Sequence, residues 1–179
     1  MRRLAQGAAL AALLALPGCG YSLVGKGMHL DPSIHRIGVP IFKDQTGRPG
    51  LDQVVTEKVV EELMRKGHFE VVTDSSNVDA SVEGEILTYR AVPIGFSQLG
   101  LGSSASTQAT RYAIVMTVKV AFKRTGDTED IWSTDSLSAR EESDVGDNPS
   151  AYFDRSDQAV DRLATSFARS LVAAMFEAF

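Results

Sequence analysis

Residues Arg111–Lys123 read RYAIVMTVKVAFK, and this stretch decides the fold. Its large apolar side chains stand at every second position, namely Tyr112, Ile114, Met116, Val118, Val120 and Phe122. The positions between them hold alanine, valine, threonine and lysine and are more polar. A period of two residues is typical of a strand with one buried face. The pattern therefore predicts a sheet that is covered on one side and open on the other.

Other strand-like stretches lie on both sides of this one. Ala80–Tyr89 precedes it, with Gly84 as a predicted bulge, and Asp130–Ala139 follows it. His35–Phe42 alternates as well, and Pro40 within it predicts an edge strand or an unpaired point, because proline cannot donate to a ladder. A shorter candidate covers residues 69–72. Four main strands are expected.

Two helices are predicted. Leu51–Lys66 has apolar residues at three- and four-residue steps and is followed by the stop signal Gly67. Asn148 and Pro149 are typical of a helix start, and an apolar stripe runs from Val160 to the C-terminus. The order of elements predicts an α+β two-layer sandwich, with two helices packed on one face of a four-stranded mixed sheet. We expect function on the bare face.

The segment from Pro93 to Thr110 is rich in glycine and serine. Such a composition predicts a mobile connection between the two strands of a long hairpin. A phosphate-binding loop is the alternative, but the segment lacks the G-x-x-x-x-G-K-[ST] spacing of that motif.

The N-terminus has the features of an export signal. Arg2 and Arg3 precede the leucine- and alanine-rich run Leu4–Leu16, which is shorter than the roughly 20 residues that span a bilayer. The run ends at Leu16-Pro17-Gly18-Cys19, which resembles a lipobox. We therefore expect a signal peptide over 1–18, a lipidated tether over 19–34 and one domain over 35–179.

Cys19 is accordingly predicted to carry the acyl chains that hold the protein to a membrane. A buried or stray thiol is the alternative interpretation of this single cysteine. Gly20 replaces the aspartate that retains enterobacterial lipoproteins in the inner membrane, so the outer membrane is the expected location.

Charge and motifs argue against several function classes. The formal net charge of −5 disfavours non-specific nucleic-acid binding. His29, His35 and His68 lack metal-ligand spacing, and no G-x-S-x-G occurs. Glu141, Glu142 and Asp144 could form an acidic site, but a charged loop explains them. We predict no enzyme activity, no metal and no cofactor.

Basic residues surround the predicted central hairpin: Arg90, Arg111, Lys119, Lys123 and Arg124. Arg90 and Arg111 bracket the glycine-serine segment, so we expect them at one end of the sheet. Guanidinium and ammonium groups bind phosphate through charge-assisted hydrogen bonds. A phosphate-bearing ligand is one interpretation of this set, and scattered solvating charges are the other.

Four short motifs together resemble a known family. They are Gly18-Cys19-Gly20-Tyr21, IGVPIF at 37–42 with Pro49-Gly50-Leu51, Val78-Asp79-Ala80 with EGEI at 83–86 and Tyr89, and Arg111-Tyr112. The chain resembles the LptE family, the lipopolysaccharide-assembly lipoproteins of the Gram-negative outer membrane. Asp44 stands where the family often has asparagine.

This resemblance implies a two-helix, four-strand sandwich that plugs the large β-barrel translocon LptD, assists its folding and binds lipopolysaccharide. It also implies that Arg90, Arg111, Lys119 and Lys123 are candidates for contact with lipopolysaccharide phosphates. Residues 37–42 and 69–72 also resemble lipoproteins that form export pores or activate a peptidoglycan synthase. A lipid-binding shuttle is the third alternative.

Overall fold

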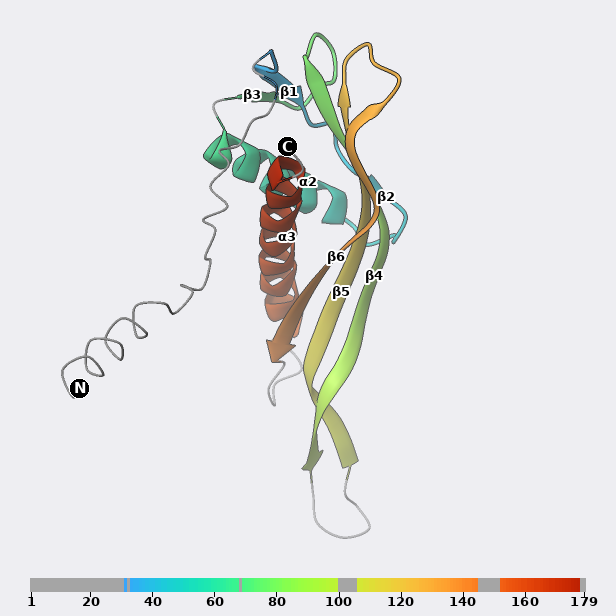
Figure 1. The fold of residues 1–179 in the computed structure, drawn as a ribbon. Coiled ribbons are helices and arrows are strands. Elements are labelled where there is room, and N and C mark those ends of the chain that lie inside the picture. The colour runs from blue at the N-terminus through green and yellow to red at the C-terminus, as the bar shows by residue number, and fades with distance from the viewer. Residues whose placement is uncertain (1–30, 32, 68, 100–105, 145–151, 178–179) are drawn as a thin grey trace, which may run out of the picture.

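The computed structural model describes residues 31, 33–67, 69–99, 106–144 and 152–177 (Figure 1). The predicted signal peptide, most of the tether, Cys19 and the helix-start pair Asn148-Pro149 lie outside these residues. No helix in the described part of the chain is long and apolar enough to cross a membrane.

The described residues form one mixed sheet and two helices. The strands are β1 (Arg36–Gly38), β2 (Lys43–Asp44), β3 (Glu70–Val72), β4 (Ala80–Leu99), β5 (Ser106–Arg124) and β6 (Asp130–Asp144), and the helices are α2 (Leu51–Lys66) and α3 (Tyr152–Glu177). The strand order is β3-β1-β4-β5-β6, and β2 pairs with β4. Pairing among β4, β5 and β6 is antiparallel, whereas β1 pairs parallel with β3 and β4, as β2 does with β4. The α+β class with two helices on a mixed sheet is confirmed.

The predicted number of strands was wrong, because the described sheet has six strands and not four. The predicted strand over residues 35–42 is β1 alone, and the chain then leaves the ladder before β2 begins. At this departure the ring of Phe42 turns into the core and lies so close to Gly84 that a Cβ there would be 2.2 Å from it. The Phe42 N–H donates to Thr56 Oγ1 at 3.0 Å instead of to a strand. Pro40 lies in this break, in agreement with an unpaired point, whereas the edge position is wrong because β1 lies between β3 and β4.

The core lies between the sheet and the helices. On β5 the predicted alternation is confirmed, since Met116, Val118, Val120 and Phe122 have no exposed surface. The helices contribute fully buried residues, among them Val55, Val59, Leu63, Leu163, Phe167 and Met175. Both helices lie on the same side of the long strands (Figure 1). In the part of the chain that the structure describes, the opposite face carries no helix.

The central hairpin is longer than the sequence predicted. Residues 93–99 and 106–110 are paired strand, and only 100–105 of the glycine-serine segment lie outside the described residues. An antiparallel ladder needs backbone N–H and C=O groups, which serine, threonine and glycine supply as well as apolar residues do. β6 ends opposite Arg111, so the far end of the hairpin is a two-stranded ribbon.

A bulge interrupts β4, but not at the predicted position. Gly84 pairs regularly with Val120, and its missing side chain makes room for Phe42 instead. The register shifts at Leu87: Ile86 pairs with Val118, but Thr88 pairs with Thr117. Leu87 is therefore the extra residue, and the face on which each side chain lies changes parity there.

Candidate functional site

The four predicted cations all lie on the uncovered face of the sheet. Arg111, Lys119 and Lys123 occupy the β5 positions that alternate with the buried ones. Arg90 pairs with Val115, which has the same parity, and directly opposed residues share a face. The Leu87 bulge is what places Arg90 there, because the alternation that starts at Val82 would otherwise turn it inward.

These cations form a line and not a cluster. Arg111, the Arg90–Val115 pair, Lys119 and Lys123 follow one another at steps of four residues along β5. Each step corresponds to about 13 Å in a strand. The structure therefore does not bring the four residues together, and one phosphate group cannot contact them all.

Three of the four cations already have an acidic partner. Arg111 Nε lies 2.6 Å from Asp144 Oδ1, Lys119 Nζ lies 2.7 Å from Asp135 Oδ1, and Lys123 Nζ lies 3.1 Å from Glu83 Oε2. The hydrogen bond to Asp135 raises the pKa of Lys119 and lowers the pKa of Asp135. An anionic ligand at these sites must compete with a carboxylate. Exposed pairs of this kind are weak, so the competition is feasible.

Arg90 has no ion pair among the described residues. A second arginine, Arg140, lies on the other side of β5 from it. Val115 pairs with Arg90 on one side and with Arg140 of β6 on the other. The two exposed arginines therefore flank Val115 on the uncovered face, with backbones about 10 Å apart, or two strand spacings. Their long side chains can converge on one anion above Val115. Arg140 Nη2 contacts Glu142 Oε1 at 3.1 Å.

Sequence reasoning missed Arg140. In the chain it stands beside Glu141 and Glu142, which were interpreted as a charged loop, but these residues belong to β6. Only the register between β5 and β6 shows that Arg140 shares a row with Arg90. The adjacent row offers hydroxyl groups to a polar ligand, since Thr117 Oγ1 and Ser138 Oγ lie 3.2 Å apart there.

A groove of about 330 Å³ opens on the same face, nearer to the β1–β2 break. Lys119 and Lys123 line it together with Lys43, and Ile41 forms an apolar wall with 60% of its surface exposed. Lys43 pairs with Glu85, which in turn pairs with Lys119, so charges of opposite sign alternate across the floor. Beyond Arg90, Val92 is exposed on this face, whereas register shifts at Ile94 and after Gly95 turn the exposed Phe96 to the other face.

Within the described residues there is no group of three or more histidine, cysteine, aspartate or glutamate residues that could hold a metal ion. Cys19, the predicted lipidation site, lies outside these residues. The chemistry available on the uncovered face is thus that of exposed cations, hydroxyl groups and apolar side chains in separate rows.

Solved structures similar to this one have little sequence in common with it. A putative lipoprotein from Caulobacter crescentus has 13% identity and a TM-score of 0.50, over 76% of this chain and 88% of that one. A protein of the DUF330 family from Xanthomonas campestris has 11% identity and a TM-score of 0.51, over 83% and 92%. A hypothetical protein from Chlamydia trachomatis has 10% identity and a TM-score of 0.50, over 79% and 95%. At such identities the likeness establishes the fold alone.

The sequence itself is more specific. No curated protein matches it. The model of one protein family, described as LptE, lipopolysaccharide-assembly, matches residues 34–175, which is nearly all of the described domain. The chain therefore belongs to the LptE family of lipopolysaccharide-assembly proteins.

Proposed function

We propose that this protein is an outer-membrane lipoprotein, anchored through Cys19, that binds lipopolysaccharide on its uncovered sheet face and plugs the LptD-like β-barrel translocon. Its role is binding and assembly, not catalysis. The observation that carries the binding proposal is the row Arg90–Val115–Arg140, which puts two arginines over one small apolar residue on an open face.

The chemistry of this row fits a phosphate group. Two guanidinium groups offer ten N–H donors in planar arrays, and the hydroxyl groups of Thr117 and Ser138 lie in the next row. Arg111, Lys119 and Lys123 are proposed as further phosphate contacts, weaker because each must first leave its carboxylate partner. The line of cations suits a ligand with several phosphates better than a single free ion.

Apolar side chains beside the arginines support an amphiphilic ligand. Val92 is 49% exposed and lies on the same face as Arg90, two residues further along β4. Burying such side chains against acyl chains is worth roughly 25 cal/mol for each Å² removed from water. A ligand with phosphates at one end and acyl chains at the other matches this order of residues.

The binding proposal is tested with purified lipopolysaccharide and the full domain. Arg90→Glu combined with Arg140→Glu is expected to weaken binding at least tenfold, because two attractive contacts become repulsive. Arg169→Glu is the matched control, since Arg169 is an exposed arginine on α3, away from the sheet face. An unchanged affinity in the double variant, with native circular dichroism, would refute the proposed site.

The partner is tested separately. A mild-detergent pull-down of the tagged lipoprotein from outer membranes is expected to recover a large β-barrel in equimolar amount. Recovery of a peptidoglycan synthase would instead favour the activator alternative, and a ring of the protein itself would favour the export-pore alternative.

A further inference from the structure

Two exposed arginines, one on either side of β5, set the charge of the proposed binding site. β5 lies between β4 and β6 (Figure 1), and Val115 of β5 pairs with Arg90 of β4 and with Arg140 of β6. We call these three residues the arginine row. Val115 is small and partly exposed, so an anion above it meets a guanidinium group from each side.

One carboxylate contacts the arginine row from the rows that lead toward the hairpin end. There Ala113 pairs with Glu142, and two residues further along β5 Arg111 pairs with Asp144. Glu142 Oε1 lies 3.1 Å from Arg140 Nη2, whereas Asp144 Oδ1 lies 2.6 Å from Arg111 Nε. The hydrogen bond from Arg111 to Asp144, and after it the charges of Asp144 and Glu142, raise the pKa of Arg111. Arg111 is therefore largely neutralised by its own partner.

Neutral groups border the arginine row on its other side. Thr117 pairs with Thr88 and with Ser138, and none of these three side chains carries a charge. The next cation along β5, Lys119, lies four residues from Val115, or about 13 Å in a strand, and it is paired with Asp135. The arginine row is thus a local concentration of two positive charges, which a single carboxylate partly offsets.

Phosphate esters differ in two properties that such a row can distinguish. A phosphate monoester carries a charge of about −1.5 to −2 at pH 7 and has three terminal oxygens that accept hydrogen bonds. A phosphodiester, the form present in ordinary phospholipids, carries a single charge and has one terminal oxygen fewer. A guanidinium group binds best to a pair of oxygens through two parallel N–H donors. Two guanidinium groups that approach from opposite sides can both bind a monoester in this way, with one oxygen shared, whereas a diester offers a single pair of oxygens.

We infer that the arginine row selects a terminal phosphate monoester over a phosphodiester, with Arg140 as the specificity-determining residue that supplies the second guanidinium. This inference rests on the proposed function, and it names the chemical group that the proposed site binds. Phospholipids with diester headgroups are then poor competitors for the site. Glu142 acts against this selection, because its carboxylate repels the more highly charged monoester more strongly than the diester.

The first test compares two lipids that differ only in the phosphate ester. Phosphatidic acid is a monoester and phosphatidylglycerol is a diester, and both are used with the same acyl chains. Each is titrated into the full chain in a non-ionic detergent, and calorimetry gives the affinity. The natural chain is expected to bind phosphatidic acid about tenfold more tightly, because a second charge-assisted contact is gained.

The variants should move this preference in opposite directions. Arg140→Gln is expected to reduce it to about threefold, because only one guanidinium group remains in the row. Glu142→Gln is expected to increase it by about twofold, since the repulsion that it removes is screened by solvent. Arg169→Gln and Glu129→Gln are the matched controls, because they make the same charge changes at exposed positions away from the arginine row. Both controls should leave the preference unchanged.

A second test uses soluble esters, which separates the phosphate group from the lipid. Methyl phosphate, a monoester, is expected to shift the guanidinium NMR signals of Arg90 and Arg140 at lower concentration than dimethyl phosphate, a diester. Equal affinity for the two lipids, or a preference that survives Arg140→Gln, would overturn the inference even if lipopolysaccharide still binds. Selection between the soluble esters by both arginines, without any binding of lipopolysaccharide, would support the inference and refute the proposed function instead.

Discussion

The covered and uncovered faces of β5 come from alternate residues of one stretch of chain, yet different interactions fix them. On the covered face, Met116, Val118, Val120 and Phe122 are completely buried under two helices. On the uncovered face, Lys119 and Arg111 hold exposed carboxylates of β6, and Thr117 contacts Ser138. Packing under the helices fixes the first set. Pairs between neighbouring strands, whose partners the strand register determines, fix the second set.

This difference separates stability from recognition. Packing contributes most of the free energy of unfolding, so residues on the covered face tolerate little change. The charges on the uncovered face contribute little to stability, because exposed ion pairs are worth at most about 1 kcal/mol. Residues of the uncovered face can therefore be exchanged to test binding while the fold persists.

The largest effect is expected from a matched pair of substitutions on the two faces of β5. Phe122→Ala should lower the free energy of unfolding by about 3–5 kcal/mol, because it leaves a cavity under the helices. Thr117→Ala should change it by no more than about 1 kcal/mol, since only one exposed hydroxyl contact is lost. Urea denaturation measures both values. Similar losses at the two positions would show that the open face is covered in solution.

A smaller effect is expected where β4 meets the β1–β2 break. Gly84→Ala places a Cβ 2.2 Å from the Phe42 ring, and such overpacking costs about 1–3 kcal/mol. The same change should be less harmful in a chain that also carries Phe42→Leu, because the ring atoms in question are gone. A double-mutant cycle by urea denaturation gives the coupling. Additive losses would mean that the ring does not determine the need for glycine.

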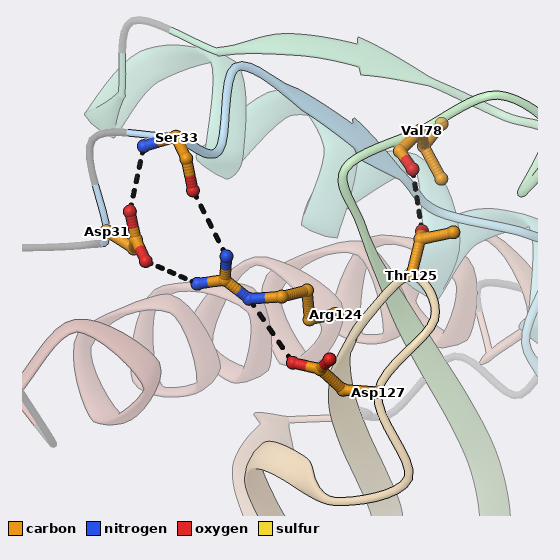
Figure 2. A network of polar contacts seen from close by, with 6 residues as sticks. All are labelled: Asp31, Ser33, Val78, Arg124, Thr125 and Asp127. Atoms are coloured by element: carbon orange, nitrogen blue, oxygen red, sulfur yellow. Dashed lines mark hydrogen bonds and ion pairs between the residues drawn. The ribbon is translucent and has the colours of Figure 1, made fainter.

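The smallest effect is expected from the contacts of Asp31 with Ser33 and Arg124 (Figure 2), as a function of pH. The backbone N–H of Ser33 and then the side chain of Arg124 lower the pKa of Asp31 from 3.8 to about 2. A lowered pKa in the folded state stabilises the fold above about pH 4, and this contribution is lost as the pH falls toward 2. The urea midpoint of Asp31→Asn should therefore approach that of the natural chain between pH 4 and pH 2. Glu129→Gln is the control, and a constant gap between the two midpoints would contradict the assignment.

The helices and the long strands could be predicted because their signals are local. The apolar stripe of Leu51–Lys66 gives α2 with the same bounds, and the alternation in Arg111–Lys123 gives the core of β5. The division of residues 35–44 into β1 and β2 could not be predicted. It coincides with the contact between Phe42 and Gly84, two residues that only the folded chain brings together.

The candidate site could be predicted only in part, for the same reason. The positions of Arg111, Lys119 and Lys123 on the open face follow from their parity in one strand. Arg140 could not be found, because its row is set by the pairing of Val115 with both neighbouring strands. The ion pairs that occupy three of the four predicted cations also depend on register and bulges, which leave no local pattern in the sequence.

The extra residue in β4 has a consequence for changes in chain length. Deleting the codon for Leu87 would join Ile86 directly to Thr88 and leave an unbroken alternation from Val82 to Pro93. Arg90 would stay on the open side and Tyr89 on the helix side, because only the extra residue is lost and every pair with β5 is kept. A one-residue deletion at this position would thus leave both faces of the hairpin as they are, whereas a slip of one residue within the regular ladder would turn every following side chain to the other face.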